Sequence, residues 1–222
     1  MRGKQRRKRQ NRVSSRFYLK AHLPIFLLSA LQLNKFRIIK SEIRILGVDD
    51  GQFEPHTQGT VIVIGVVFRG GQTMDGVMHT HVEIDGFNAT EQLATMVNKS
   101  SHYRQLRLIM LNGVTLAGFN IVDIQKLNEA TNLPVIAVTL KKPDLGNIRE
   151  ALLNLSNPED RWQSILSAGE IHEIRCKGKT LYIEIAGISI FDAQEIIKAT
   201  SINSSFPEPL RVAHMVASGV TP

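Results

Sequence analysis

The sequence predicts an α/β fold in which helices flank one mixed β-sheet, an antiparallel meander plus parallel strands. Three β-prone runs follow one another through short turns, as the strands of an antiparallel meander do. After residue 87 the apolar residues change to the three-to-four-residue spacing of helices. Short buried strands then alternate with these helices, and strand–helix–strand units require parallel neighbouring strands. One mixed sheet covered by helices satisfies all three observations.

The meander occupies the first part of the predicted domain. Its first strand is Ile43–Val48, and its second, Val61–Phe68, is almost continuously apolar and β-branched, which is typical of a strand covered on both faces. A turn signal at 69–71 leads into the third strand, Val77–Ile84, whose side chains alternate between two faces. The turns are short, so these strands are expected to be antiparallel neighbours.

The second part alternates helices and strands. The predicted helices are Asn88 to about Asn98, Ile121–Ala130, one capped by Asp144 or Asn147 and ending near Leu155, Pro158–Ala168, Asp192–Ala199 and Pro207–Ser218. The predicted strands are Leu106–Leu111, Pro134–Thr139 and Leu181–Ala186. This element order is that of a ribonuclease H-like domain.

Composition excludes several classes of protein. The 222 residues are 43% hydrophobic and 21% charged, which suits one large or two small globular domains. No apolar stretch reaches the roughly 18–20 residues that cross a bilayer, so we expect no membrane partner. The one cysteine, Cys176, excludes an internal disulfide and a Cys-based zinc site. It fits a reducing compartment, and we expect a cytoplasmic protein.

Positive charge is confined to the N-terminal part of the chain. Residues 1–40 carry twelve Lys and Arg and no acid, and the remainder carries fifteen basic and twenty acidic residues. We therefore expect a basic, disordered leader over residues 1–36 and one folded domain over 37–222. The leader is either an arm that contacts phosphates or, as we favour, an upstream extension. The apolar stretch Leu23–Leu33 lacks the cleavage site of a signal peptide.

Polar residues that could do chemistry lie where the predicted strands end. Asp49 and Asp50 follow the first strand, Asp85 follows the third, and Asn112 ends the fourth. Glu91 lies in the first turn of the helix after Asp85. Ligands of open α/β sheets bind beyond the ends of strands. Since the first and fourth strands are predicted to be parallel neighbours, Asp49 and Asn112 should meet at one edge of the sheet.

Carboxylates that gather in one place have a chemical use. They repel one another unless a cation lies between them, and Mg²⁺ prefers one or two carboxylates plus water and phosphate oxygens. Such an ion activates water for displacement at phosphorus. Asp and Asn before Gly are also favoured in turns, so each position alone has a purely structural interpretation. The metal hypothesis requires Asp49, Asp85 and Glu91 to gather around one ion.

Five segments together carry a family resemblance. They are ILGVDDG (45–51), VIVIGVVFRGG (61–71), MLNGVTLAGFNIVDI (110–124), LPVIAVTLKKPDL (133–145) and PEPLRVAHMVASG (207–219). The chain resembles, over about residues 37–222, an uncharacterised archaeal family related to endonuclease V, some of whose members have been called endonuclease dU. The resemblance implies a ribonuclease H-like fold and Mg²⁺- or Mn²⁺-dependent cleavage of DNA or RNA near a deaminated base such as uracil or hypoxanthine.

The resemblance also implies roles for single residues. Asp49 matches the first metal-binding Asp, and Glu91 best matches the acid of the helix after the third strand, with Asp85 competing for that role. His214 matches the polar residue of the closing helix near the metal. Asn112 stands where endonuclease V has Asp, and an amide oxygen brings no charge. The expected catalytic residues are Asp49, Asp85 and Glu91, and the expected metal ligands are Asp49, Asp50, Glu91, Asn112 and His214.

Basic residues are candidates for contacts to nucleic acid. Lys141 or Lys142, just past the strand Pro134–Thr139, would contact a phosphate. Arg211 lies three residues before His214, on the same face of the closing helix, so both could reach one site. The alternating pair His79 and His81 is either a transition-metal pair or, as we favour, solvent-facing.

Two functions follow from these expectations. The first is a metal-dependent endonuclease acting on nucleic acid with a modified base. The alternative is a non-catalytic nucleic-acid-binding protein on a degenerate nuclease scaffold, whose metal site Asn112 impairs. The sequence leaves the oligomeric state open.

Overall fold

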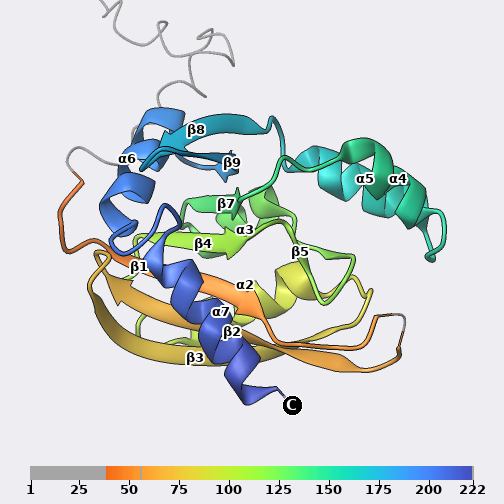
Figure 1. The fold of residues 1–222 in the computed structure, drawn as a ribbon. Coiled ribbons are helices and arrows are strands. Elements are labelled where there is room, and N and C mark those ends of the chain that lie inside the picture. The colour runs from red at the N-terminus through yellow and green to blue at the C-terminus, as the bar shows by residue number, and fades with distance from the viewer. Residues whose placement is uncertain (1–38, 56, 222) are drawn as a thin grey trace, which may run out of the picture. The chain divides into compact units, whose positions relative to one another are not determined.

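The computed structural model describes residues 39–55 and 57–221, so the predicted leader lies outside the described residues. The described part belongs to the second of two units of the chain, residues 34–222. It contains a seven-stranded sheet with helices on both faces (Figure 1). The strands of this sheet are β1 (Arg44–Asp50), β2 (Thr60–Arg69), β3 (Thr73–Glu83), β4 (Leu108–Asn112), β7 (Val135–Thr139), β8 (His172–Cys176) and β9 (Lys179–Ala186).

The order of the strands in the sheet is β3-β2-β1-β4-β7-β9-β8. β1, β2 and β3 form the antiparallel meander, β1, β4 and β7 are parallel, and β9 is antiparallel to both β7 and β8. The predicted mixed sheet is therefore confirmed. A separate two-stranded sheet joins β5 (Thr115–Leu116) and β6 (Asn120–Ile121), which follow β4 in the chain.

Six helices are described: α2 (Ala89–Lys99), α3 (Ile124–Thr131), α4 (Leu145–Leu152), α5 (Pro158–Ser167), α6 (Ile190–Thr200) and α7 (Glu208–Val220). Alternation along β1 shows which helices cover which face. Leu46 and Val48 pack in one cluster with buried residues of α2 and α3, whereas Ile45 packs with residues of α6 and α7. The two pairs of helices thus lie on opposite faces of the sheet. No described helix is long and apolar enough to cross a membrane.

The close approach of α7 to β1 depends on a glycine. A Cβ added at Gly47 would collide with the backbone of Pro209, in the first turn of α7. The helix therefore rests directly on the strand, and Figure 1 shows it running across β1 and β2. This contact fixes where the rest of α7 lies over the carboxyl end of β1.

The structure differs from the predicted elements where the apolar pattern is weak. β8 was not predicted, because only Ile174 and Cys176 of its five residues are buried. β3 begins at Thr73, four residues before the predicted start, in a polar stretch. The helix expected from Ile121 begins at Ile124, after the short strand β6.

Side-chain hydrogen bonds set the starts of two helices. The side chain of Asp144, not that of Asn147, caps α4, since its Oδ1 accepts from the backbone N–H groups of Gly146 and Asn147. Asn88 makes no side-chain cap at α2. Instead, the buried Asn120 of β6 accepts the N–H of Ala89 at 2.9 Å, which ties the start of α2 to the segment after β4.

Candidate metal site and nucleic-acid contacts

The candidate site is centred on Asp49, which is 3% exposed at the carboxyl end of β1. Its Oδ2 accepts a hydrogen bond from Nδ2 of Asn112 at 3.1 Å and lies 2.8 Å from Nδ1 of His214. Its Oδ1 accepts from the backbone N–H of Asp50 at 3.1 Å. The predicted meeting of Asp49 and Asn112 at one edge of the sheet is thereby confirmed, and His214 joins them.

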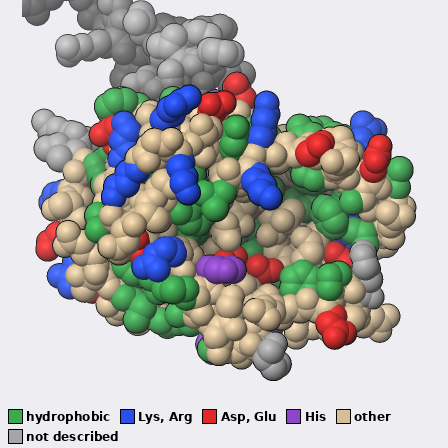
Figure 2. Space-filling view, in the orientation of Figure 1, with side chains coloured by type: hydrophobic (Ala, Val, Ile, Leu, Met, Phe, Trp, Pro, Cys, Tyr) green, Lys and Arg blue, Asp and Glu red, His purple; other side chains and the backbone are tan. Residues whose placement is uncertain are grey.

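The fold explains why these three side chains meet. β1 and β4 are parallel and pair Val48 with Leu111, so the next residues, Asp49 and Asn112, emerge together at the strand ends. His214 comes from α7, which Gly47 allows to rest on β1. The side chain of His214 is 64% exposed, so the site has a buried carboxylate and a solvent-facing imidazole. Figure 2 shows, on this side of the molecule, a histidine with acidic side chains at a hollow and Lys and Arg side chains above it.

The charge of Asp49 is not balanced by a fixed cation. Among the described residues its one ion-pair partner is His214, and no Lys or Arg contacts it. A buried carboxylate in that situation favours a bound cation. The donor set also fits a divalent cation. A 180° turn of the Asn112 amide would present its oxygen beside the Asp49 carboxylate and the His214 imidazole. These three groups would leave other coordination positions for water and phosphate.

Asp50 does not share the position of Asp49. Successive side chains of a strand point to opposite faces, and Oδ2 of Asp50 accepts the N–H of Ala117 at 2.5 Å, on the side of α2 and α3. Burial raises the pKa of Asp50 to about 6, an effect that the hydrogen bond from Ala117 opposes and the negative charge of Asp49 assists. Its predicted role as a metal ligand beside Asp49 is not supported by this placement.

Asp85 and Glu91 lie apart from Asp49 as well. Oδ1 of Asp85 accepts the N–H of Phe119 at 2.8 Å, so this side chain joins the turn after β3 to the β5–β6 connection. The backbone of Asp85 has a positive φ of 50°. Glu91 is exposed on α2 and lines a cavity of about 440 Å³ with Phe119 and Arg161. Within the part of the chain that the structure describes, no three acidic, His or Cys side chains could hold one ion. The predicted gathering of three carboxylates is wrong there, since Glu91 lies on α2, which covers the opposite face from α7, and Asp85 is bound to Phe119. The metal hypothesis in its three-carboxylate form therefore fails, and a metal site would rest on Asp49, Asn112 and His214 instead.

The predicted phosphate contacts come from two places. Lys141 and Lys142 are exposed just past β7 and line a second cavity, which also contains Glu184 of β9. Arg211 lies one turn before His214 and forms an ion pair with Glu208 at 2.6 Å. Their contacts with nucleic acid stay predictions.

The sequence analysis missed Arg161 of α5. Its guanidinium is buried and donates to the backbone carbonyl oxygens of Phe119 at 2.6 Å, Gly86 at 3.0 Å and Ser156 at 2.9 Å, and to that of Asp85. It also lies 4.0 Å from the centre of the Phe87 ring. No local pattern marks it, since its neighbours Glu159 and Asp160 are ordinary exposed charges.

Glu184 was missed for a different reason. It is 5% exposed within a strand that the sequence analysis predicted to be buried, and a single charged residue in an apolar run was the only available signal.

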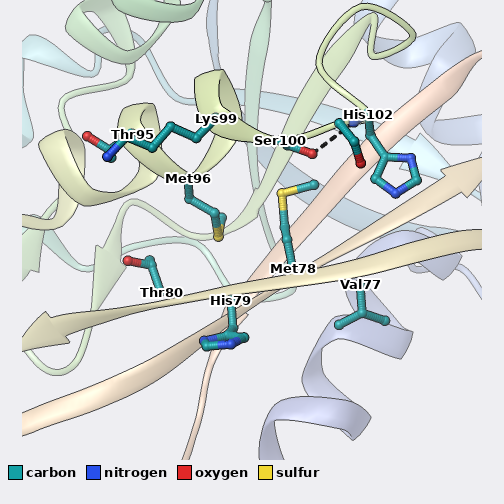
Figure 3. A pocket seen from close by; sticks show the side chains of 10 residues that line it. Val77, Met78, His79, Thr80, Thr95, Met96, Lys99, Ser100 and His102 are labelled. Atoms are coloured by element: carbon teal, nitrogen blue, oxygen red, sulfur yellow. Dashed lines mark hydrogen bonds between the residues drawn. The ribbon is translucent and has the colours of Figure 1, made fainter.

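The histidine pair faces solvent, as favoured. His79 and His81 are exposed on β3, with ring centroids 5.9 Å apart. Figure 3 shows the cavity between β3 and α2, lined by Met78 and Thr80, with His79 pointing to the other side of the strand. The described residues supply no third ligand for a metal there.

Comparisons with known proteins agree with this architecture. A family model described as endonuclease dU matches residues 41–221. A UPF0215 protein of Methanothermobacter thermautotrophicus is 51% identical over 193 residues, which cover 86% of this chain and 94% of that protein. The crystal structure of a protein of unknown function from Archaeoglobus fulgidus is 39% identical, with a TM-score of 0.73, covering 80% of this chain and 98% of the other.

A more distant likeness concerns the fold. The structure of Ciona intestinalis endonuclease V, in complex with DNA containing an inosine, has a TM-score of 0.51 at 13% identity and covers 87% of this chain and 95% of that one. This likeness confirms the expected ribonuclease H-like sheet. Because the family model spans most of the chain and the archaeal relative is 51% identical, the chain belongs to the endonuclease dU family.

Proposed function

We propose that this protein is a divalent-metal-dependent endonuclease that cleaves DNA or RNA near a deaminated base such as uracil or hypoxanthine. The observation that carries the proposal is the buried carboxylate of Asp49, contacted by Asn112 and His214 and balanced by no described Lys or Arg. The family description and the inosine-containing DNA bound to the Ciona endonuclease V support the substrate class.

The residues around Asp49 have distinct roles in this proposal. Asp49 and Asn112, with His214 beside them, would hold Mg²⁺ or Mn²⁺, and such an ion supplies an activated water and neutralises charge at phosphorus. Asp49 orients His214 through Nδ1, and Nε2 of that ring makes no hydrogen bond with the described residues. Nε2 can therefore hold or release a proton at the solvent-facing side of the site.

Binding of the strand uses groups outside this centre. Lys141 and Lys142 would contact phosphates, and Arg211 would do so while sharing its charge with Glu208. An altered base cannot be inspected inside the stack, so the target nucleotide would leave it before cleavage.

A non-catalytic nucleic-acid-binding function is the competing candidate. It is favoured by Asn112, because among the described residues the carboxylate of Asp49 contacts a neutral amide and an imidazole and no second carboxylate. A single carboxylate holds a divalent ion less firmly than two do. Calorimetric titration with Mg²⁺ separates the candidates, since a degenerate site gives no heat of binding.

The direct test is cleavage of labelled oligonucleotides that carry one uracil, hypoxanthine or xanthine, with and without Mg²⁺ or Mn²⁺. We expect metal-dependent cleavage of at least one of them and none of the unmodified strand. Asp49→Asn should lower the rate by more than about 100-fold, because even groups one step removed from a metal typically contribute about 10–100-fold. Denaturing gels measure the products.

The matched control is Asp160→Asn, which alters an exposed carboxylate of α5. It should cleave like the parent, and both variants should unfold at the parent temperature. A folded Asp49→Asn variant that cleaves at the parent rate would remove Asp49 from the mechanism.

A further inference from the structure

The second cavity lies at the carboxyl end of β7 and has a volume of about 300 Å³, at the lower end of the range for small-molecule sites. Its apolar lining includes Leu145 and Ile148 of α4 and Ile165 of α5. The exposed Lys141 and Lys142 line it as well. It therefore combines apolar surface with positive charge at the edge of the sheet.

Glu184 is the acidic side chain that lines this cavity. It lies on β9 opposite Ala137 of β7, is 5% exposed, and makes no hydrogen bond or ion pair with the described residues. Burial alone raises the pKa of its carboxyl to about 7. The carboxyl is therefore mostly removed from bulk water but has no fixed donor, and a ligand in the cavity that supplies a donor would be bound there.

The cavity is close in the chain to the centre of the proposed chemistry. Gly113, which lines it, directly follows Asn112, whose amide contacts Asp49. β1, β4 and β7 are parallel neighbours, so their carboxyl ends lie along one edge of the sheet. A strand held at Asp49 would thus pass near the cavity, with Lys141 and Lys142 available to its phosphates.

We infer that Glu184 is a specificity-determining residue, which accepts the ring N–H of a nucleobase that has left its strand and entered this cavity. The inference rests on the proposed function. Uracil and hypoxanthine carry a ring N–H where cytosine and adenine carry a ring-nitrogen acceptor. A carboxyl offers an acceptor oxygen in both of its protonation states, and the apolar lining suits the faces of the ring.

The test measures binding without cleavage, in Asp49→Asn protein and without divalent metal. The probes are fluorescent oligonucleotides that carry one uracil or one N3-methyluracil, in which a methyl group replaces the ring N–H. The variants are Glu184→Met, which keeps the side-chain length but removes both acceptor oxygens, and Glu170→Met, a control at an exposed position. Glu184→Gln retains one acceptor oxygen and measures rescue.

We expect protein with Glu184 to bind the uracil strand at least about tenfold more tightly than the N3-methyluracil strand, as for a hydrogen bond to a charged group. Glu184→Met should bind both strands alike, Glu184→Gln should keep part of the preference, and Glu170→Met should keep all of it. Equal binding of the two strands by protein with Glu184, or a preference that survives in Glu184→Met, overturns the inference.

Two further outcomes separate this inference from the proposed function and from another source of the base. If the preference depends on Glu184 but no strand is cleaved with metal, the cavity assignment stands and the endonuclease proposal fails. The other outcome is that free uridine binds in calorimetry only when Glu184 is present, while the uracil and N3-methyluracil strands bind equally tightly. The ligand of the cavity would then be a free nucleoside, and the inference of a base from a strand would be overturned.

Discussion

Asn112 is the residue that decides how strongly the site around Asp49 can hold a metal. Its amide contacts the carboxylate at 3.1 Å but contributes no charge. In Asn112→Asp two carboxylates would face each other, and like charges at that separation repel strongly unless a cation lies between them. The substitution should therefore lower the stability of the metal-free protein and raise its affinity for a divalent metal.

We expect Asn112→Asp to melt about 4–8 °C below the parent in EDTA, which corresponds to roughly 2 kcal/mol for a protein of this size. Addition of Mg²⁺ should restore the melting temperature of the variant. The variant should also need a lower Mg²⁺ concentration for cleavage than the parent does. Thermal unfolding with and without metal measures the effect. A melting temperature that Mg²⁺ does not change would show that these two positions do not share an ion.

Glu184 makes stability depend on pH. Its pKa is raised by burial from 4.5 to about 7, so the folded state favours the protonated form. The folded protein then loses stability as pH rises from about 4.5 to about 7, by a total of roughly 3 kcal/mol. Glu184→Gln cannot ionise, so it should match the parent near pH 4.5 and melt about 6–12 °C above it at pH 8. Melting curves across this pH range test the prediction, and a constant difference would contradict it.

Single residues were predicted unevenly. The meeting of Asp49 and Asn112 followed from parallel neighbouring strands, which the sequence pattern indicates. The position of Glu91 did not, because a helical pattern shows which stripe of a helix is buried but not which face of the sheet the helix covers. The role of Asp85 in closing a loop depends on Phe119, which is far away in the chain.

At the scale of elements, α5 packs through Ile165 and is joined to the loops around it through the buried Arg161. Arg161 joins the helix to the loop after β3 and to the β5–β6 connection through backbone carbonyl oxygens. Burial lowers the pKa of this guanidinium, and the nearby carboxylate of Asp85 opposes that shift. The carbonyl groups would lose their donors if this side chain were removed.

We expect Arg161→Met to lower the free energy of unfolding by at least about 3 kcal/mol, since several buried carbonyl oxygens would be left unsatisfied. The exposed Arg149 of α4, which lies over the Trp162 ring, provides the control Arg149→Met, and that change should cost under about 1 kcal/mol. Urea unfolding gives both values. Equal effects of the two substitutions would mean that the buried contacts of Arg161 add little.

For the whole molecule, the fold was largely predictable because its central strands are apolar and its connections short. β8 escaped prediction because it lies at the edge of the sheet, and only two of its five residues are buried. The site was less predictable than the fold, since it depends on which helix lies over which strand end.

The distribution of charge along the whole chain gives a prediction about binding. Residues 1–36 carry ten Lys and Arg, whereas all the residues assigned here to chemistry and base recognition lie in the described part. Removal of residues 1–36 should weaken binding to every strand alike and reduce its salt dependence, because fewer counterions are released. The preference for uracil over N3-methyluracil should remain, and its loss would place part of the recognition in the removed segment. Binding titrations at several salt concentrations measure both effects.

The seating of α7 on Gly47 has a consequence for biosynthesis. Ribosomes make β1 and β4 well before α7, so a nascent chain holds Asp49 and Asn112 long before His214 can reach them. Under the proposed function, the imidazole comes from a helix that is made after both strands, so the cutting centre is complete only once α7 has been synthesised and has settled on Gly47.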